Sequence, residues 1–484
     1  MRQRAGRDAG GAIGRAKLRA THLPEPLLEF AGEQLHVDQK AGLARHGPAS
    51  LGLSRHPVTM HLGFVGTGES VDAARTWIEH AAAGVPGVAE KRLPDFPGFQ
   101  DDRGFFCRLV VSDGLVALIT TRDLEELKAI GRVAPRFEAA VKLVGERVRL
   151  LAQQDAAPNV VILALPDPLL DLTARVRFHD EDRGLVHRDF RRALKAELMQ
   201  HRLPTQILLQ YVTQAEPGAR GVDHPSRVAW NLFTSLYFKA GGVPWRPVGL
   251  SPDTCYIGVS FHRPIGSADP IMRSSVAQAF DEHGTGLVLR GPDFPWDSSR
   301  NGPSPHLDAD HARALLELVL KRYRQEAQRP PARVVLHKTS RYWEDERRGF
   351  QDALGDIDQF DFVTLSPTSE VRLVRAGRYP PLRGTLLTVD FTDYLYTTGY
   401  VPALRGYPHG HVPSPLQIAE HVGDASARRI AEEILILTKM NWNSAGFAGA
   451  LPITIRFSRL VGEIMREVPA DPDREPLPQF KFYI

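Results

Sequence analysis

The hydrophobic pattern of the first half of the chain alternates between short apolar runs and longer periodic stretches. The run at residues 159–165 is almost wholly apolar, which is typical of a strand at the centre of a parallel sheet. Further strands are expected at residues 58–65, 105–111, 116–120 and 207–211. Helical spacing of apolar residues predicts helices at 71–83, 134–153, 187–201 and 227–240. Strands that alternate with helices predict a doubly wound α/β sheet across roughly residues 57–250.

A second α/β unit is expected from residue 254 onwards. Its first strands are predicted in succession at residues 255–261, 271–280 and 286–290, and a Pro/Ser-rich surface loop is predicted at 292–305. Later strands at 333–337, 362–365 and 384–390 are accompanied by helices at 308–328, 342–354, 427–437 and 459–467. Three strands in a meander, followed by alternation of strands and helices, is the order expected of an RNase H-like fold.

Composition limits the class of protein. A length of 484 residues is too great for one hydrophobic core, so two or three domains are expected. The net charge is only +3, so a nucleic-acid site must come from local clusters of basic residues. The two cysteines, Cys107 and Cys255, are too few for a disulfide framework. No run approaches the roughly 20 apolar residues of a membrane span, and a cytoplasmic protein without membrane contact is expected.

The N-terminal region differs in composition from the rest. Residues 1–22 are rich in arginine and glycine near their start and lack the apolar segment of a signal peptide, so a basic, disordered leader is expected. Residues 23–56 are turn-rich and are expected to form a lead-in segment before the first sheet.

Two short motifs invite a functional interpretation but support a structural one better. Gly66 and Gly68 follow a predicted strand, yet Val71 stands where a dinucleotide fingerprint has its third glycine. An ordinary tight turn is favoured over a nucleotide-binding enzyme. The segment from His306 to His311 contains metal-ligand residue types, but it opens a predicted helix, where Asp and His are natural capping residues.

Four polar residues have the chemistry of a phosphate site. Arg191 and Lys195 are four positions apart on one predicted helix, so both point to one face. Gln206 follows a Leu-Pro-Thr turn, and Lys239 ends a helix before two glycines. A terminal phosphate requires several converging cationic or amide donors. On spacing alone, a solvated basic helix face with a routine C-terminal lysine explains the pattern better.

The segment from Leu437 to Ser444, with the sequence LTKMNWNS, lies between two predicted helices and favours an ordered turn. Together with the LPIT sequence at residues 451–454, it also resembles the signature of the PIWI domain of Argonaute proteins. That resemblance implies a Rossmann-like MID domain at residues 57–250 and an RNase H-like PIWI domain at 251–484.

The resemblance extends to the phosphate-type residues. The MID domains of the family hold the 5′-phosphate of a guide strand with a set similar to Arg191, Lys195, Gln206 and Lys239 in order and spacing. Arg191 stands where the family usually has an aromatic residue. The family also uses its C-terminal carboxylate to hold a divalent ion, so Ile484 is expected to bind a structural Mg²⁺ at the guide 5′ end, provided that the chain ends there.

The catalytic positions implied by the resemblance are degenerate. An active PIWI domain needs several carboxylates to bind two metal ions. The family positions fall on Ser260, Thr339 and Arg459, none of which is acidic. No catalytic residue and no cleavage of the target are therefore expected. The alternative is an autonomous guide-directed nuclease with a displaced metal site built from nearby carboxylates: Glu344, Asp345, Asp390 and Asp393.

Taken together, these features resemble a short prokaryotic Argonaute with MID and PIWI domains only. By family analogy, such a protein binds a 5′-phosphorylated guide RNA and recognises single-stranded DNA of plasmids or phage. It then activates a partner that contains an APAZ domain and carries the enzymatic activity. A sirtuin-like NADase is slightly favoured as that partner over a TIR NADase or a nuclease.

Overall fold

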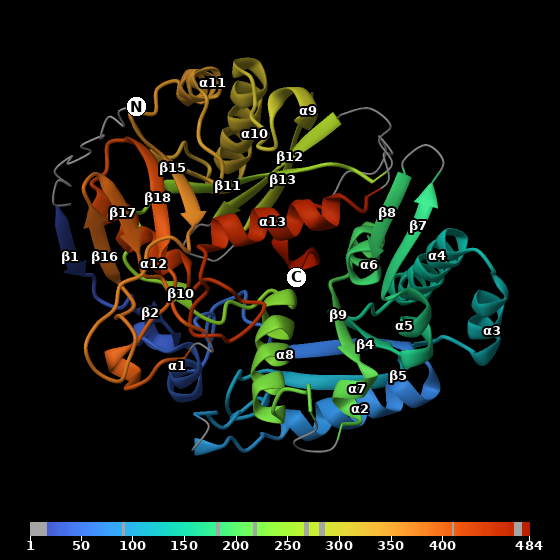
Figure 1. Cartoon of the computed structure of the whole chain (residues 1–484). Coiled ribbons are helices and arrows are strands. Elements are labelled where there is room, and N and C mark those ends of the chain that lie inside the picture. The colour runs from blue at the N-terminus through green and yellow to red at the C-terminus, as the bar shows by residue number, and fades with distance from the viewer. Residues whose placement is uncertain are drawn as a thin grey trace, which may run out of the picture.

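Two sheets organise the chain, one in each half of the sequence (Figure 1). The computed structural model describes residues 17–89, 92–180, 184–215, 220–265, 271–279, 286–408, 411–468 and 477–484. Helix α13 (Ile453–Met465) and the C-terminus lie between the two sheets in Figure 1. None of the helices in these ranges is long and apolar enough to cross a membrane.

The first sheet is parallel and has the strand order β5-β4-β6-β9. Its strands are β4 (Thr59–Gly66), β5 (Arg108–Leu118), β6 (Val160–Leu165) and β9 (Thr205–Leu209). Apolar side chains of α2 (Gly68–Ala82) and α8 (Pro225–Lys239) cover one face. The other face is covered by α3 (Thr121–Ala129), α4 (Val133–Ala152), α5 (Asp167–Thr173) and α6 (Phe190–Leu198). Helices on both faces explain why every residue of β6 is buried, and they confirm the doubly wound prediction.

The second sheet has nine strands in the order β1-β16-β17-β18-β15-β14-β11-β12-β13. The antiparallel meander consists of β11 (Thr254–His262), β12 (Ile271–Ala279) and β13 (Leu287–Pro295). The strands β14 (Arg333–Lys338) and β15 (Gln359–Pro367) continue the sheet parallel to β11, and β18 (Leu416–Gly423) is antiparallel to β15. Helices α10 (Ala309–Ala327) and α11 (Glu344–Leu354) pack on one face, while α12 (Ala427–Leu437) and α13 pack on the other. This is the order predicted for an RNase H-like unit.

Several predicted elements have different bounds. The helix predicted at residues 187–201 is wrong at its start, because β8 (Gly184–Asp189) pairs with β7 (Arg175–Asp180) and Asp189 then caps α6. The strands predicted at 105–111 and 116–120 are one strand, β5, with an irregularity in its pairing to β4. The strand predicted at 207–211 is β9 followed by the short helix α7 (Gln210–Thr213).

Two further differences lie in the second unit. The last helix, predicted at residues 459–467, begins earlier, at Ile453 directly after Pro452. Pro452 is the residue directly before the helix. The backbone N–H at this position is not used by the helix, so a proline, which has none, fits there. The loop predicted at residues 292–305 is shorter than expected, because β13 continues to Pro295 by pairing with β12, and α9 (Ser298–Asn301) follows.

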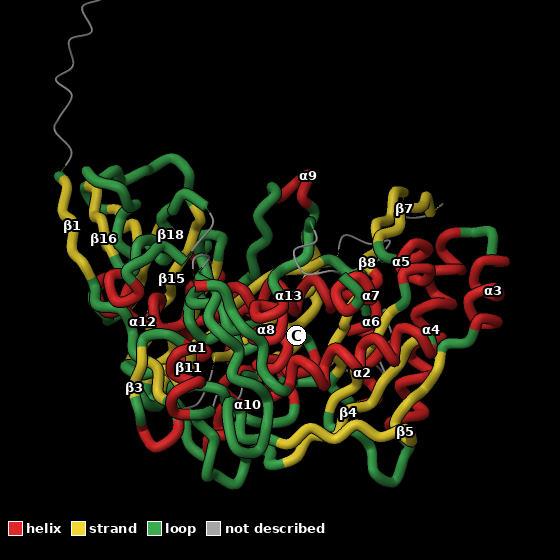
Figure 2. Tube along the Cα trace, turned by 90° about the horizontal axis from the view of Figure 1, so that it is seen from below, coloured by secondary structure: helices red, strands yellow, loops and turns green. Residues whose placement is uncertain are grey.

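The N-terminal segment is part of the second sheet. Strand β1 (Leu18–His22) pairs antiparallel with β16 (Thr385–Val389), at the edge of the molecule opposite α3 and α4 (Figure 2). The prediction of a disordered leader is therefore wrong for residues 18–22, and residues 1–16 lie outside the described part of the chain. The remaining short elements are β2 (Leu28–Glu29), β3 (Leu35–His36), α1 (Gln39–His46), β10 (Arg246–Pro247) and β17 (Thr392–Leu395).

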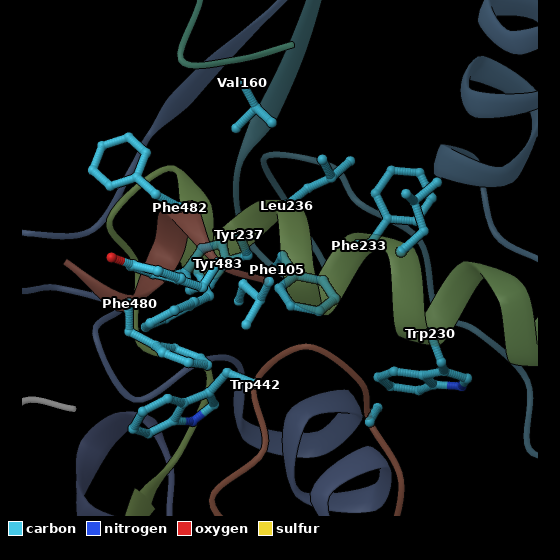
Figure 3. Packing of buried hydrophobic residues seen from close by; sticks show 14 of the residues in the cluster. Phe105, Val160, Trp230, Phe233, Leu236, Tyr237, Trp442, Phe480, Phe482 and Tyr483 are labelled. Atoms are coloured by element: carbon cyan, nitrogen blue, oxygen red, sulfur yellow. The ribbon is translucent and has the colours of Figure 1, made fainter. Parts of the chain in front are cut away.

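The segment from Leu437 to Ser444 holds the two units together. Trp442 is buried, stacks on Phe238 of α8 at 5.2 Å between ring centroids, and donates to the Trp245 carbonyl oxygen at 3.1 Å. Lys439 donates to the Glu25 carboxylate at 3.0 Å and so binds the lead-in segment. Figure 3 shows Trp442 in one cluster with aromatic side chains of α8 and of the C-terminal segment. The predicted ordered turn is confirmed, and its core packing is structural.

The turn after β4 is also structural. Thr67 and Ser70 cap the start of α2 reciprocally, and the Ser70 hydroxyl donates to the Ala164 carbonyl oxygen at 2.7 Å. A Cβ atom at Gly66 would collide with that same carbonyl group. The hydroxyl groups of Thr67 and Ser70 thus cap the helix, and Gly66 lets β4 pack closely against β6. The turn is structural, as the sequence indicated. Asp308 likewise caps α10, through the His311 backbone N–H at 2.9 Å.

Candidate nucleic-acid interface

A cavity of about 940 Å³ opens between the two units. Its walls come from α6, β9, α13, the turn after α12 and the C-terminal residues. Four of the five residues predicted to bind a guide phosphate line it: Arg191, Lys195, Gln206 and Ile484. The fifth, Lys239, donates to the Gln206 side-chain oxygen at 2.5 Å. The structure therefore brings the whole predicted set together, although its members come from segments almost 300 residues apart.

Lys195 is buried beneath the cavity, although it carries an ammonium group. Its Nζ donates to the Thr205 carbonyl oxygen at 2.5 Å, to the Thr205 hydroxyl at 3.2 Å and to the Ile484 main-chain oxygen at 2.5 Å. Burial, and secondarily the charge of nearby Arg191, lower the pKa of Lys195 to about 7. Without a bound anion, the charged form of Lys195 is thus strongly disfavoured.

Lys239 at the end of α8 has the same character. Only 1% of it is exposed, and burial together with the charges of Lys195 and Arg191 holds its pKa well below the usual value. Gln206 accepts from Lys239 and also from the Ser235 hydroxyl, at 3.1 Å. The Gln206 amide group is therefore held with its oxygen towards Lys239.

Six Lys and Arg residues are buried in the part of the chain that the structure describes. Four of them contact a side-chain carboxylate: Lys338 contacts Glu346, Arg333 contacts Glu433, and both Arg383 and Lys439 contact Glu25. Lys195 and Lys239 contact no side-chain carboxylate of the described residues: their acceptors are oxygens of Thr205, the Ile484 main-chain oxygen and the Gln206 side chain. Buried charges are normally paired, so two neighbouring lysines without a carboxylate side chain indicate an anion-binding site.

Helix α13 adds positive charge from the other side of the cavity. Arg456, Arg459 and Glu463 follow one another at helical spacing and line the wall together. Glu463 forms an ion pair with Arg192 at 2.7 Å, which leaves the charges of Arg456 and Arg459 facing the cavity. Burial lowers the pKa of Arg456. No phosphate role was predicted for Arg456, although its spacing of three residues from Arg459 was a signal.

Two asparagines of the turn after α12 also line the cavity and were not predicted as site residues. The Asn443 side-chain oxygen lies 3.1 Å from the Ser235 hydroxyl, whose single proton it shares with Gln206, and Asn441 accepts from the Asn443 backbone N–H at 3.2 Å. The LTKMNWNS segment thus has one buried side, formed by Trp442, and one side on the cavity. Its amide groups were visible in the sequence, but their direction depends on how the turn packs against α8.

The cavity was also expected to hold Mg²⁺, which prefers carboxylate and phosphate oxygens. Ile484 presents its main-chain oxygen to the cavity, and that oxygen already accepts from Lys195. One main-chain oxygen can serve as a single ligand of Mg²⁺, provided that most of the other ligands come from a bound phosphate.

A second cavity, of about 310 Å³, brings together Ser260, Thr339 and Arg459, the three predicted degenerate positions. Gly258 permits this arrangement, because a Cβ there would collide with the Thr454 carbonyl group of α13. The Ser260 hydroxyl donates to the Ser458 carbonyl oxygen at 2.5 Å. No Asp or Glu is among the described residues that line this cavity. The described ranges also contain no group of three or more His, Cys, Asp or Glu residues able to hold a metal ion.

The carboxylates weighed as substitutes for the catalytic acids have other contacts. Asp345 forms an ion pair with Arg348 at 2.8 Å in α11, which Glu344 begins. Asp390 accepts from the Lys17 backbone N–H at 2.9 Å, and Asp393 accepts from the Thr388 hydroxyl at 2.6 Å. None of the four lines the second cavity.

Comparison with known proteins identifies the fold. No protein-family model and no curated protein matches the sequence. Among solved structures, Clostridium butyricum Argonaute bound to a guide DNA and a 19-mer target DNA matches 93% of this chain with a TM-score of 0.64 and 16% identity. Crystal structures of A. aeolicus Argonaute and Drosophila Piwi each match 96% of the chain with a TM-score of 0.57, at 15% and 12% identity.

The chain spans about half the length of these proteins, covering 53%, 55% and 56% of them respectively. The similarity includes both sheets, since it extends over nearly the whole chain. Together with the strand orders described above, it shows that this chain has the MID–PIWI fold of Argonaute proteins.

Proposed function

We propose that this chain binds the 5′-phosphate of a guide strand in the 940 Å³ cavity and uses the guide to recognise a complementary target strand. The observation that carries the proposal is the pair of buried lysines, Lys195 and Lys239, neither of which contacts a carboxylate side chain in the described part of the chain. The Argonaute fold supports it, since the C. butyricum protein was solved with guide and target DNA.

The physical argument concerns the cost of buried charge. A terminal phosphate carries a charge between about −1.5 and −2 at neutral pH and offers three acceptor oxygens. Placed between Lys195, Lys239 and Arg191, it would restore the protonated form of both lysines. Gln206 would add an amide donor or orient Lys239, and Mg²⁺ bound through Ile484 would neutralise further phosphate charge. A 5′-hydroxyl guide lacks this dianion and would bind more weakly.

The finer assignments of the proposal follow the resemblance noted in the sequence. The guide is a 5′-phosphorylated RNA, and the target is single-stranded DNA from invading plasmids or phage. Recognition takes place in the cytoplasm and activates a partner with an APAZ domain, for which a sirtuin-like NADase is slightly favoured over a TIR NADase or a nuclease. Guide–target pairing then supplies the sequence specificity, and the protein holds backbone and 5′ end.

The chain itself does not cut the target in this proposal. Two Mg²⁺ ions need several carboxylate ligands, and the second cavity is lined by hydroxyl groups and a guanidinium group instead. Arg459 would repel a metal ion at this position. The alternative, autonomous cleavage with displaced ligands, requires one of Glu344, Asp345, Asp390 or Asp393 to act as a ligand.

The direct test compares one 3′-labelled RNA in two forms, with a 5′-phosphate and with a 5′-hydroxyl, by fluorescence anisotropy. The native protein should favour the phosphate form, and Lys195→Met or Lys239→Met should remove most of that preference. Lys142→Met, on the exposed side of α4 in the same unit, is the matched control and should keep it. Equal losses for both RNA forms would show that the two lysines contact the backbone only.

A cleavage assay separates the proposal from its alternative. Guide-loaded protein is incubated with labelled complementary DNA and Mg²⁺ or Mn²⁺. No product is expected. Product that disappears on Glu344→Gln or Asp345→Asn would establish the displaced metal site.

A further inference from the structure

Two ion pairs connect the first unit to α13 beside the 940 Å³ cavity. Arg188 near the end of β8 pairs with Glu467, just after α13. Arg192 of α6 pairs with Glu463 of α13. The two arginines are four residues apart, and so are the two glutamates. Figure 1 shows the end of α13 beside α6. The same two segments are thus joined twice, by pairs that differ in burial.

The inner pair, Arg188–Glu467, is structural. Both side chains are almost wholly buried, and each has a second contact. Glu467 also accepts from the Asp189 backbone N–H at 3.2 Å, and Arg188 also donates to Glu138, at 2.5 Å. Removing one partner of a buried pair leaves an uncompensated charge, so such a pair does not exchange readily. The inner pair therefore holds the two units together whether or not the cavity is occupied.

The outer pair, Arg192–Glu463, has the opposite character. Both side chains line the cavity, and 40% of Arg192 and 48% of Glu463 are exposed. Their nitrogen and oxygen atoms are 2.7 Å apart, and neither side chain forms another ion pair with a residue that the structure describes. Water and salt ions compete for exposed charges, so a pair of this kind contributes little to stability. Arg192 can therefore exchange Glu463 for another anion.

Glu463 is an unexpected residue in a cavity that suits an anion. Most charged side chains that line the cavity are cationic, and Asp189 and Glu463 are the two acids among the described lining residues. Asp189 caps α6 by accepting from the Arg192 backbone N–H at 3.1 Å. Glu463 lies well inside α13 and has Arg192 as its ion-pair partner. A carboxylate in this place repels a phosphate, so it opposes the binding that the lysine pair favours.

We propose that the Arg192–Glu463 pair is a latch on the first cavity. In the free protein, Glu463 occupies the Arg192 guanidinium, and a guide phosphate takes its place when the guide binds. The inference rests on the proposed function and adds to it an arginine, Arg192, and an internal competitor, Glu463. Binding then requires an anion strong enough to displace a carboxylate.

The exchange is chemically simple. A guanidinium donates two parallel N–H bonds to a carboxylate or to a phosphate. Arg192 lies three residues before Lys195 on α6, so both side chains are on one face of the helix. A phosphate that approaches the buried Lys195 therefore meets the Arg192 guanidinium. A terminal phosphate carries a charge between about −1.5 and −2 at neutral pH, more than the single charge of Glu463.

The experiment is a double-mutant cycle on binding. Affinities for one 5′-phosphorylated, 3′-labelled RNA are measured by fluorescence anisotropy for the native protein, Arg192→Gln, Glu463→Gln and the double variant. Repulsion between Glu463 and the phosphate is present in both Arg192 backgrounds and cancels in the cycle, whereas the attraction between Arg192 and Glu463 does not. Glu463→Gln should raise the affinity, and the gain should be about threefold to fivefold larger in the native background than in the Arg192→Gln background.

The Arg322–Glu326 pair of α10 is the matched control. Its atoms are also 2.7 Å apart, its side chains are similarly exposed, and neither residue lines the first or the second cavity. The same two substitutions in this pair should leave the affinity unchanged. At high salt the non-additivity of the Arg192–Glu463 cycle should shrink, because salt screens an exposed pair. Equal gains from Glu463→Gln in both backgrounds at low salt would overturn the latch, since the pair would then stay closed in the complex.

The cycle and the test of the guide site fail separately. Non-additivity without a preference for 5′-phosphorylated over 5′-hydroxyl RNA would reject the proposed terminal phosphate site and keep the latch, opened by another phosphate of the RNA. A normal 5′-phosphate preference with an additive cycle would reject only the latch.

Discussion

Two groups of buried cations in this protein differ in how they are neutralised. Arg333 lies in the second sheet and donates to Glu433 at 2.6 Å and to Asp361 at 2.8 Å, and Asp361 also contacts His421 at 2.7 Å. Lys195 and Lys239 are equally buried but contact no acidic side chain that the structure describes; their acceptors belong to Thr205, Gln206 and the Ile484 main chain. The first group is paired with acidic side chains of the chain, whereas the second contacts none of the described ones. The contrast distinguishes a structural buried charge from one kept for a ligand.

The largest difference is expected in stability. Arg333→Met should lower the free energy of unfolding by about 3–5 kcal/mol, because it leaves the buried Glu433 and Asp361 without their cation. Lys195→Met should cause no comparable loss at pH 7, since it removes a group that burial disfavours. Urea denaturation of both variants without nucleic acid measures this. A loss as large for Lys195→Met would mean that Lys195 is as structural as Arg333.

A second contrast is the pH dependence of stability. Lys195 has a pKa of about 7 in the folded chain and an ordinary value of 10.5 when exposed. Between these values the unfolded state binds more protons, so the free energy of unfolding should rise with pH through this window. The contribution is on the order of 3 kcal/mol from pH 7 to 10. It should be absent from Lys195→Met, so the native and variant curves converge towards high pH.

Ligand binding should show the opposite dependence on pH. A 5′-phosphate favours protonated Lys195, so binding above pH 7 takes up a proton and the guide affinity should fall by up to about tenfold per pH unit. Titrations of the 5′-phosphorylated guide between pH 7 and 9 measure this slope. The slope should be much shallower for Lys195→Met and for the 5′-hydroxyl guide. A pH-independent affinity of the native protein would contradict the assignment.

The smallest effect is expected at the rim of the first cavity. Arg456→Ala should weaken guides with a 5′-phosphate and with a 5′-hydroxyl equally, by about fivefold, because Arg456 faces the cavity from α13 without contacting the lysine pair. Salt titration of both guides should show a shallower slope for the variant. A loss confined to the 5′-phosphorylated guide would place Arg456 within the terminal phosphate site.

The sequence predicted those parts of the structure that depend on local pattern. Strand β6 and helix α12 follow from apolar periodicity alone, and α12 has the predicted bounds. Strand β1 was missed because its partner, β16, lies more than 360 residues away. The start of the basic helix was predicted too early, at residue 187, because the pairing of β8 with β7 overrides helical periodicity there.

The candidate site shows the same limit. Residue types and spacing identified Arg191, Lys195, Gln206 and Lys239, and the resemblance to Argonaute proteins supplied the hypothesis of their common role. The burial of Lys195 and Lys239 could not be predicted, because it depends on the C-terminal residues packing against α8. The absence, among the residues that the structure describes, of a carboxylate side chain in contact with the two lysines, which distinguishes a binding site from a structural ion pair, is likewise a property of the packing.

The most direct measurement is a structure of the protein with a 5′-phosphorylated guide and a complementary target. The terminal phosphate should lie within about 3 Å of both Lys195 Nζ and Lys239 Nζ, which is hydrogen-bond distance for charged donors. A guide bound with its 5′ end outside the cavity lined by Lys195 and Gln206, with the two lysines still facing only protein oxygens, would contradict the account.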